Sequence, residues 1–239
     1  MDMTFKIYRY DPTADPEPRY RTYRVRAEPA DRILDCLNRI KWEQDGTLAY
    51  RMSCGHGVCG SDAMKINGLC GLACQKLVKD YRDSEVVLEP LPSFKVLKDL
   101  MVDMTLFLQR VSLIRPYLIN ASTPPDKERL QDASDNKKLN EVIRCILCAS
   151  CTAACPVTAE NEAYLGPAAF VRAFRFIFDS RDDQTLERLR QVDTPNGVWG
   201  CVNHFKCTPV CPKEIPVTKS INTIKREIRH LLKTTENPQ

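Results

Sequence analysis

The chain has 239 residues, 43% of them hydrophobic, and a formal net charge of +4 at pH 7. This length is enough for one large or two small domains with a real core. The charge is modest and no aromatic–basic motif accompanies it, so we expect no nucleic-acid partner. No run approaches the roughly 18 apolar residues needed to span a bilayer. The twelve cysteines are the exceptional feature, because they indicate either a disulfide framework or soft-metal sites.

The first hundred residues predict a small mixed sheet crossed by one helix. Residues 5–10 and 20–26 alternate between apolar and polar side chains around a Pro- and Asp-rich turn, as a hairpin does. Residues 31–43 predict a helix, and residues 63–66 and 85–89 predict further strands. No apolar signal core precedes the hairpin, so a secreted disulfide framework is not expected.

The first cysteine pattern lies in a glycine-rich segment, Ser-Cys-Gly-His-Gly-Val-Cys-Gly-Ser-Asp. Plant-type 2Fe-2S (two-iron) sites use C-x4-C-x2-C and a distant fourth cysteine. Cys54, Cys59 and Cys74 fit this pattern, and Asp62 stands at the third cysteine position. A carboxylate oxygen also binds iron, so we expect Asp62 to complete the site. The alternative is that Asp62 is a solvated turn residue and Cys70 is the ligand.

From about residue 100 onward the periodicity becomes helical. A first helix is expected from about Val102 to Pro116, and Asp126 is expected to cap a short helix after a Pro-Pro break. Residues 166–178 predict an amphipathic helix with proline in its first turn, whose aromatic stripe packs in the core. Residues 215–232 predict the last helix.

The second cysteine pattern consists of two runs of equal length. The first run, Cys-x2-Cys-x2-Cys-x3-Cys-Pro, has the bacterial ferredoxin spacing, in which three thiolates bind one cluster and the fourth binds another. The second run lacks one cysteine and has His204 in its place. Crosswise pairing gives a complete set of thiolates for a 4Fe-4S (four-iron) cluster: Cys145, Cys148, Cys151 and Cys211. The remaining thiols suit a 3Fe-4S (three-iron) cluster: Cys155, Cys201 and Cys207.

Zinc is the main alternative for these cysteines, since paired C-x2-C units are its usual signature. Zinc sites usually pair two such units across a loop, whereas three thiols here follow one another in one segment. The Cys-Pro endings also belong to the cluster pattern. Cys36 lies among helically spaced apolar residues and is expected to pack as a small hydrophobe. Cys70 is a bystander or an alternative two-iron ligand.

Together these motifs resemble one family, the iron–sulfur subunit of succinate dehydrogenase and fumarate reductase (respiratory complex II). The resemblance covers nearly the whole chain. It rests on these further segments: Tyr50-Arg-x-Ser-Cys54, Gly57-Val-Cys-Gly-Ser61, Leu72-Ala-Cys74, Lys98-Asp-Leu-x-Val-Asp103, Cys145-Ile-Leu-Cys148, Phe178-Asp-Ser-Arg-Asp182 and Val210-Cys-Pro-Lys213. It implies an α+β fold, with an N-terminal plant-type ferredoxin-like β-grasp domain over residues 1–104. An all-α bacterial-ferredoxin-like domain follows over residues 105–239.

The resemblance also implies a function. In this family a partner flavoprotein with covalent FAD oxidises succinate to fumarate. Electrons then pass through the 2Fe-2S, 4Fe-4S and 3Fe-4S clusters to a quinone, beside a cytochrome b-type membrane anchor. The chain is therefore expected to be peripheral on the cytoplasmic face of a prokaryotic inner membrane, with no succinate-binding catalytic residue of its own. Fumarate reductase, the same parts run in reverse, is the alternative within the family. A stand-alone carrier, or a subunit serving another oxidoreductase, is the alternative outside it.

The expected quinone side departs from the family pattern. Many ubiquinone-using members have a tryptophan shortly after Cys-Pro, where this chain has Val-Thr-Ala-Glu, and a histidine where this chain has Val202. Pro156 carries over, and both ubiquinone and menaquinone are compatible with the sequence. We expect His204 to line the quinone side; the alternative is a fourth ligand to the three-iron cluster. Lys225 matches a family lysine whose charge eases reduction of that cluster; the alternative is a solvated lysine.

Overall fold

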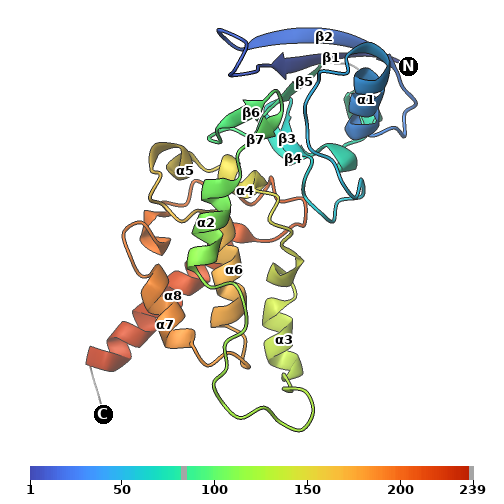
Figure 1. Ribbon diagram of the computed structural model, residues 1–239. Helices are drawn as coiled ribbons and strands as arrows, with labels where there is room; N and C mark the ends of the chain where they lie inside the picture. Colours follow the sequence, from blue (N-terminus) through green and yellow to red (C-terminus); the bar gives the residue numbers. More distant parts are fainter. Residues whose placement is uncertain (82–84, 237–239) are drawn as a thin grey trace. The chain divides into compact units, whose positions relative to one another are not determined.

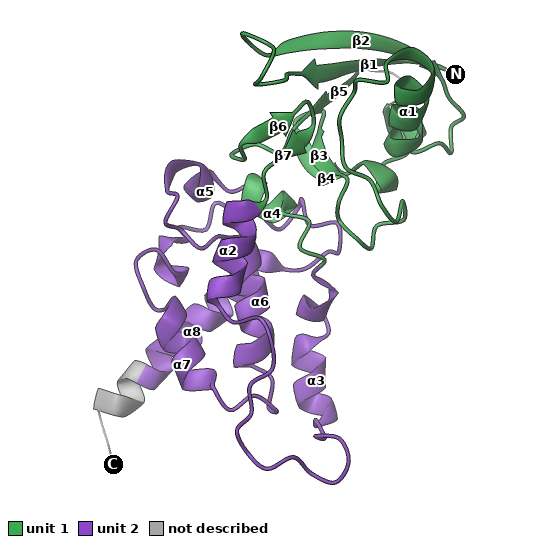
Figure 2. Ribbon diagram, viewed as in Figure 1, with its two compact units in different colours: residues 1–104, 146–154 green, residues 105–145, 155–239 purple. Residues whose placement is uncertain are grey.

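The computed structural model describes residues 1–81 and 85–236. Two compact units make up the chain (Figure 2): residues 1–104 with 146–154, and residues 105–145 with the chain from residue 155 onward. The short segment 146–154 belongs to the first unit because Ile146 and Cys148 pack against the core of that unit. The sequence predicts a single domain boundary after residue 104. Nothing in the cysteine spacing indicates that residues 146–154 belong to the first unit.

The first unit is built on a mixed five-stranded sheet (Figure 1). Its strands are β1 (Asp2–Arg9), β2 (Arg19–Arg26), β3 (Ala63–Ile66), β4 (Leu69–Leu72) and β5 (Val86–Glu89). Their spatial order is β2-β1-β5-β3-β4. β1 and β2 form the predicted antiparallel hairpin, whereas β5 runs parallel to β1 and antiparallel to β3. Parallel neighbours need a long crossover connection, and the helix and the glycine-rich loop both lie in it.

The predicted helix is shorter than its periodicity suggests. α1 (Ile33–Arg39) continues into a single π-helical turn, Ile40–Gln44. Its buried side chains, Cys36 among them, join the core of the sheet. Cys36 is fully buried, and this burial raises the pKa of its thiol to about 12. Its packing role is confirmed.

A buried ion-pair network connects the sheet with the chain that leads to the glycine-rich loop. The Arg9 guanidinium donates to Asp45 at 2.5 Å and to Asp99 at 3.0 Å. Asp99 in turn accepts from the backbone N–H of Ala49 at 2.8 Å. All three charged side chains are buried, so the pairing compensates the loss of their hydration. The network fixes the chain only a few residues before Cys54.

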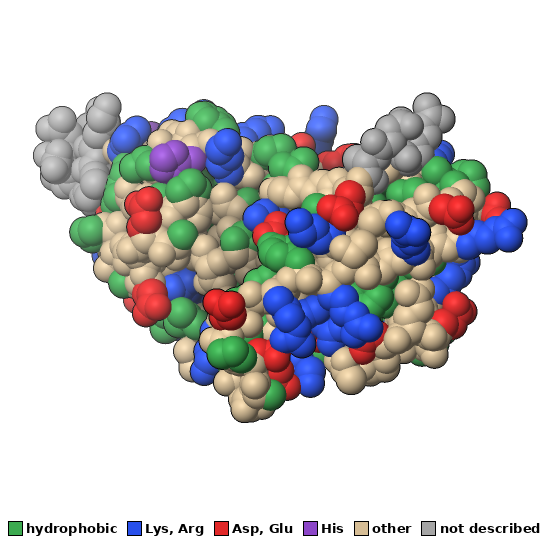
Figure 3. Space-filling model, turned by 90° about the horizontal axis from the view of Figure 1, so that it is seen from above, with side chains coloured by type: hydrophobic (Ala, Val, Ile, Leu, Met, Phe, Trp, Pro, Cys, Tyr) green, Lys and Arg blue, Asp and Glu red, His purple; other side chains and the backbone are tan. Residues whose placement is uncertain are grey.

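The outer edge of the sheet is rich in arginine. Arg19, Arg21, Arg24 and Arg26 are all exposed on β2. Figure 3 looks from the top of Figure 1, where β2 lies, and shows Lys and Arg side chains gathered on this face. Charged side chains on an edge strand oppose pairing with a second sheet. The arginines on β2 therefore protect this edge strand against pairing with another sheet.

The second unit is helical. It contains α2 (Thr105–Leu113), α3 (Ala133–Leu139), α5 (Pro156–Glu160), α6 (Pro167–Ile177), α7 (Thr185–Val192) and α8 (Val217–Glu236). The central helix is α6, which packs against α2, α7 and α8. As predicted, Pro167 occupies its first turn and its aromatic stripe is buried at Phe170 and Phe176. None of the helices that the structure describes is both long and apolar enough to cross a membrane.

A fully enclosed arginine holds α7 in place. The Arg188 guanidinium makes two hydrogen bonds to Asp182, at 3.0 and 2.8 Å. It also donates to the backbone carbonyls of Ile114, Arg115 and Tyr117. The side chains of this ion pair are 1% and 0% exposed. A charge so deeply buried is tolerated only because its donors are satisfied.

Two local predictions are wrong. Val102 lies in β7 (Met101–Val102), which pairs with β6 (Val96–Lys98), so the helix begins only at α2. Asp126 caps no helix, because the following helix is α3 and its cap is Asp132, which accepts from the backbone N–H of Ser134 at 3.0 Å.

α4 (Ser150–Ala153) lies within the first ferredoxin run and packs on β4.

Candidate metal centres

The glycines of the first cysteine loop are required by its geometry. Gly55, Gly57 and Gly60 have φ angles of 70°, 77° and 71°, in the left-handed region that glycine adopts without a Cβ penalty. A Cβ on Gly60 would lie 2.8 Å from the Cβ and 3.0 Å from the Cα of Cys148. A Cβ on Gly57 would collide with the Gln75 side chain. The loop is thus tightly curved and closely packed.

Backbone amides surround the two thiols of this loop. The N–H groups of Val58 and Cys59 donate to Cys54 Sγ at 3.4 and 3.2 Å, and the N–H of Cys54 donates to Cys59 Sγ at 3.5 Å. Hydrogen bonds from the backbone, first that of His56, lower the pKa of Cys54 to about 6. The loop therefore stabilises the thiolate, which is the form that binds metal.

Asp62 is buried beside Cys74 and has one oxygen without a partner. Its side chain accepts from the backbone N–H of Cys74 at 2.5 Å through Oδ2, while the buried Oδ1 has no hydrogen bond. Burial, together with the hydrogen bond to Asp62, raises the pKa of the Cys74 thiol to about 12, and Cys54 is a further charge in its surroundings. Asp62 is 2% exposed, so it is not a solvated turn residue.

Cys70 has different neighbours. It lies in β4, opposite Lys65 of β3, and is 8% exposed. Burial raises the pKa of its thiol to about 11, and the charged groups that act on it are Lys65 and Cys148. The structure thus brings Asp62, not Cys70, to Cys74.

The donor set of this loop fits a two-iron cluster. Two thiols and a carboxylate oxygen without a partner lie on the loop, and the thiol of Cys74 lies in the short 3-10 turn that follows β4. The amide-rich, glycine-lined backbone suits anionic sulfide. Within residues 1–81 and 85–236, no three His, Cys, Asp or Glu side chains are grouped to hold a single metal ion.

The two ferredoxin runs share an uncommon backbone conformation. In the first run Leu147 and Ala149 have φ angles of 54° and 65°; in the second, Asn203 and Phe205 have φ angles of 61° and 59°. These residues coincide when Cys145 is aligned with Cys201, and His204 then takes the backbone position of Cys148. A left-handed backbone conformation at a residue other than glycine costs about 1–3 kcal/mol, and such conformations cluster at functional sites. The repeat is therefore structural as well as sequential.

The expected four-iron thiols are divided between the units. Cys148 and Cys151 belong to the first unit, and Cys145 and Cys211 belong to the second. Cys148 Sγ lies 3.5 Å from Ser150 Oγ within its unit. The backbone N–H of Ile215 donates to Cys211 Sγ at 3.4 Å. All four thiols are half-buried, and their assignment to one cluster stays a prediction.

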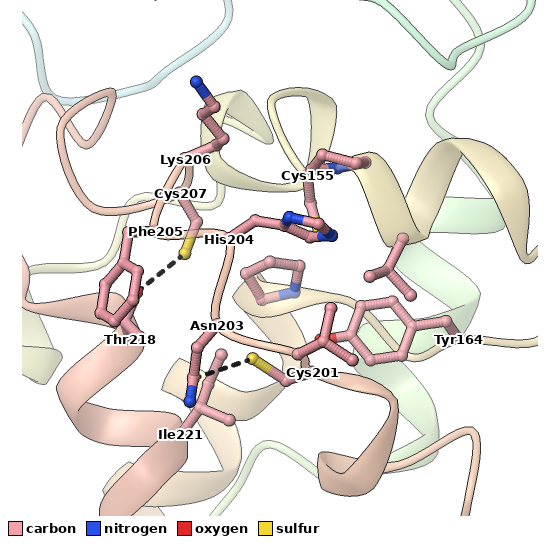
Figure 4. A pocket seen from close by; sticks show the side chains of 14 residues that line it. Cys155, Tyr164, Cys201, Asn203, His204, Phe205, Lys206, Cys207, Thr218 and Ile221 are labelled. Atoms are coloured by element: carbon pink, nitrogen blue, oxygen red, sulfur yellow. Dashed lines mark hydrogen bonds between the residues drawn. The ribbon is translucent and has the colours of Figure 1, made fainter.

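The three remaining thiols lie together in the second unit. Cys155, Cys201 and Cys207 line one pocket, along with Pro156 and His204 (Figure 4). Their donor chemistry, three thiols without a fourth, fits a three-iron cluster. Cys207 Sγ lies 3.4 Å from Thr218 Oγ1. The structure thus gathers the predicted thiols, and two predicted quinone-side residues lie beside them.

Lys225 lies behind this pocket. Its Nζ donates to the backbone carbonyl of Cys201 at 2.6 Å and lies 5.7 Å from the centre of the Trp199 ring. Lys225 is 9% exposed, so it is not a solvated lysine. Val202 and Phe205, in contrast, are 64% and 61% exposed at the pocket rim.

Comparisons with known proteins agree with these motifs. A family model described as "2Fe-2S iron-sulfur cluster binding domain" matches residues 4–109, and one described as "4Fe-4S dicluster domain" matches residues 141–215. The succinate dehydrogenase iron–sulfur subunit of Paracoccus denitrificans is 43% identical over 92% of this chain and 86% of its own length. The chain belongs to the succinate dehydrogenase iron–sulfur subunit family.

Further matches to this family cover the chain almost completely. The corresponding subunit of Coxiella burnetii is 39% identical over 98% of this chain and 99% of its own length. A solved structure titled "Mycobacterium smegmatis Sdh1 complex in the apo form" superposes with a TM-score of 0.84 at 26% identity, covering 99% of this chain and 98% of that one. The family, the α+β fold and the role in electron transfer within succinate dehydrogenase are confirmed.

Tyr164 and Thr218 line the three-cysteine pocket, and Trp199 contacts Lys225; the sequence predicts none of these three roles. None of the three is a cysteine-run residue. Tyr164 lies after the first cysteine run has ended at Cys155, and Thr218 lies in the first turn of α8. The only local signal for either is a nearby proline, because Tyr164 shortly precedes a Gly-Pro pair and Thr218 shortly follows an Ile-Pro pair.

Proposed function

We propose that this subunit of succinate dehydrogenase carries electrons from a flavoprotein partner to a quinone at a membrane anchor. When bound, the 2Fe-2S, 4Fe-4S and 3Fe-4S clusters supply one-electron sites in that order. The protein's own residues fix the ligands and set the polarity around them. The direction from succinate to quinone is favoured over fumarate reduction, because the matched relatives are named as succinate dehydrogenases.

One observation carries the proposal: three thiols share one pocket while exposed His204 takes the backbone position of the missing fourth. This supports unequal clusters in the two runs. Cys155, Cys201 and Cys207 would hold the three-iron cluster. The four-iron cluster would be held by Cys145, Cys148, Cys151 and Cys211.

For the entry cluster, the proposed ligands are Cys54, Cys59, Asp62 and Cys74. The unpartnered Oδ1 of Asp62 supports this set, because a buried carboxylate oxygen without a hydrogen bond loses its hydration uncompensated unless a metal replaces it. Carboxylate is a harder ligand than thiolate, so it also alters the cluster's potential.

The exit side is proposed at the three-cysteine pocket. Pro156 and His204 line it, and exposed Val202 and Phe205 stand at its rim. These apolar side chains suit the aliphatic and ring surface of a quinone or an anchor helix. Lys225 places its positive charge behind Cys201, which favours a reduced and more negative cluster. The quinone is ubiquinone or menaquinone.

The proposed partners are an FAD-containing flavoprotein and a cytochrome b-type membrane anchor. The proposed location is peripheral, on the cytoplasmic face of a prokaryotic inner membrane. The relatives named as succinate dehydrogenase subunits support this arrangement. Co-purification of both partners with the chain is the expected result, whereas a carrier from another system would isolate alone.

EPR spectroscopy of the purified complex tests the cluster assignment. We expect a three-iron signal in the oxidised state and a two-iron signal after reduction. A second four-iron signal in place of the three-iron signal would contradict the assignment and make His204 a ligand. Absence of iron would support the zinc alternative.

Paired variants test the entry ligands. Asp62→Ala should change the potential and weaken retention of the two-iron cluster, whereas Cys70→Ala should leave its spectrum unchanged. Cys36→Ala is the control for loss of a buried thiol outside the sites. The ligand choice is wrong if Cys70→Ala destroys the two-iron signal and Asp62→Ala leaves it intact.

A further inference from the structure

The three-cysteine pocket contains a buried hydroxyl that lacks a hydrogen bond. Tyr164 is fully buried, and among the described residues no group completes a hydrogen bond with its hydroxyl; the thiol of Cys201 is the neighbour that interacts with it. In Figure 4 its ring extends into the pocket toward Cys201. A buried tyrosine hydroxyl normally finds a partner, because leaving it unpaired forfeits its hydration. Its environment therefore calls for an acceptor inside the pocket.

The ring is held so that its hydroxyl cannot turn to solvent. A Cβ on Gly200 would lie 2.8 and 3.0 Å from two carbons of the Tyr164 ring, so glycine is needed directly before Cys201 for this close approach. Phe170 of α6 packs on the ring with centroids 5.7 Å apart. The backbone N–H of Leu165 donates to the backbone carbonyl of Asn196 at 3.0 Å and anchors the chain next to the tyrosine. Such rigid support preorganises the hydroxyl.

The groups that face the hydroxyl are the three thiols. Burial raises the pKa of Tyr164 first, and Cys201, Cys155 and Cys207 raise it further. A phenol hydroxyl can donate a hydrogen bond to an anionic sulfur. The other hydroxyl of the pocket, Thr218, is already engaged, since it lies 3.4 Å from Cys207 Sγ and 3.1 Å from Thr208 Oγ1.

We propose that the Tyr164 hydroxyl donates a hydrogen bond to the three-iron cluster, at a sulfide or at the thiolate of Cys201, and so raises its reduction potential. This inference rests on the proposed function, which places that cluster between Cys155, Cys201 and Cys207. The reduced cluster carries one more negative charge than the oxidised one. A fixed donor therefore stabilises the reduced form more strongly and makes the cluster a better electron acceptor.

The test compares the wild-type complex with its Tyr164→Phe variant, which removes only the oxygen. In a potentiometric EPR titration at a fixed applied potential, the reduced-to-oxidised ratio of the three-iron cluster should fall about tenfold in the variant. This corresponds to a midpoint potential lower by about 59 mV for a one-electron reduction. The two-iron potential in the same sample should not move. Tyr117→Phe, an exposed tyrosine of the same unit, is the matched control and should change neither potential.

A second measurement detects the donated proton directly. Pulsed ENDOR on the oxidised wild-type complex, prepared in H2O and in D2O, should reveal an exchangeable proton coupled to the three-iron cluster; Tyr164→Phe should lack it. An unchanged potential in Tyr164→Phe, or a coupled proton that persists in it, overturns this inference while the proposed function stands. A wild-type complex without a three-iron signal overturns both. If Tyr164→Phe fails to assemble, the wild-type ENDOR spectrum alone decides, and a missing coupled proton refutes the inference.

Discussion

Replacing Gly60 by alanine should destabilise the first cysteine loop more than replacing Gly55, a glycine of the same loop with open space around it. At Gly60 φ is +71°, where an L residue costs about 1–2 kcal/mol. The new Cβ would lie 2.8 Å from the Cβ and 3.0 Å from the Cα of Cys148. The Cα is backbone and cannot rotate away, so overpacking adds about 1–3 kcal/mol. The total is about 2–5 kcal/mol.

Gly55→Ala supplies the matched control. Gly55 has nearly the same φ of +70°, but no atom lies within 4 Å of the position that its new methyl group would take. The Gly55→Ala variant should therefore lose only about 1–2 kcal/mol of stability, from the unfavourable left-handed φ. The difference between the two variants isolates the contact with Cys148, a proposed four-iron ligand.

The assay is the thermal loss of cluster signals from the complex. Samples of wild type and both variants are heated at one rate, because such losses are kinetic, and the remaining two-iron and four-iron EPR signals are recorded. Gly55→Ala should lose the two-iron signal earlier than wild type, and Gly60→Ala earlier still. Only Gly60→Ala should also disturb the four-iron signal. Identical behaviour of the two variants would refute the close packing of Gly60 on Cys148.

Three further outcomes are expected. Arg188→Ala should destabilise the second unit by about 3–5 kcal/mol, because it leaves the buried carboxylate of Asp182 without its cation; an unchanged thermal midpoint of the complex would contradict this. In cluster-depleted protein, alkylation of Cys54 by iodoacetamide should rise as the pH passes about 6, because its lowered pKa makes the thiolate dominant above that pH. Cys36, whose burial raises its pKa to about 12, should stay unmodified at neutral pH in the same mass-spectrometric experiment, and equal labelling of both thiols would contradict this difference in burial and pKa. His204→Cys should replace the three-iron signal by a second four-iron signal, since His204 takes the backbone position of Cys148; a retained three-iron signal would show that geometry at this position excludes a fourth ligand.

The sequence predicts those features that depend on spacing. The hairpin and the amphipathic α6 each repeat a short pattern that local geometry dictates, and the structure confirms both, whereas the ligand sets inferred from the cysteine intervals stay predictions. The α3 region illustrates the opposite case. Only Leu139 of that helix is buried, so no apolar periodicity marks it, and Asp126 offers the same capping chemistry as Asp132. Nothing local distinguishes the two aspartates.

The backbone of the ferredoxin runs could not be predicted from the sequence either. Left-handed φ angles normally indicate glycine, yet here they occur at Leu147, Ala149, Asn203 and Phe205. The backbone strain of non-glycine residues at these φ angles is offset by the surrounding fold. Because the same conformation recurs in both runs, His204 takes the backbone position of Cys148 without a change in chain path.

The environment of the clusters depends on contacts between distant segments, which no local pattern encodes. The Oδ1 of Asp62 and the hydroxyl of Tyr164 are both buried without a hydrogen bond, although spacing singles out the first and nothing in the sequence singles out the second. Both atoms lie beside proposed ligand thiols, in separate units. A protein that leaves polar atoms unpaired loses stability unless something binds there. These two oxygens, among several buried polar atoms without a partner in the part of the chain that the structure describes, support the two proposals at opposite ends of the proposed electron path: Asp62 would complete a ligand set at the entry, and Tyr164 would tune a cluster at the exit.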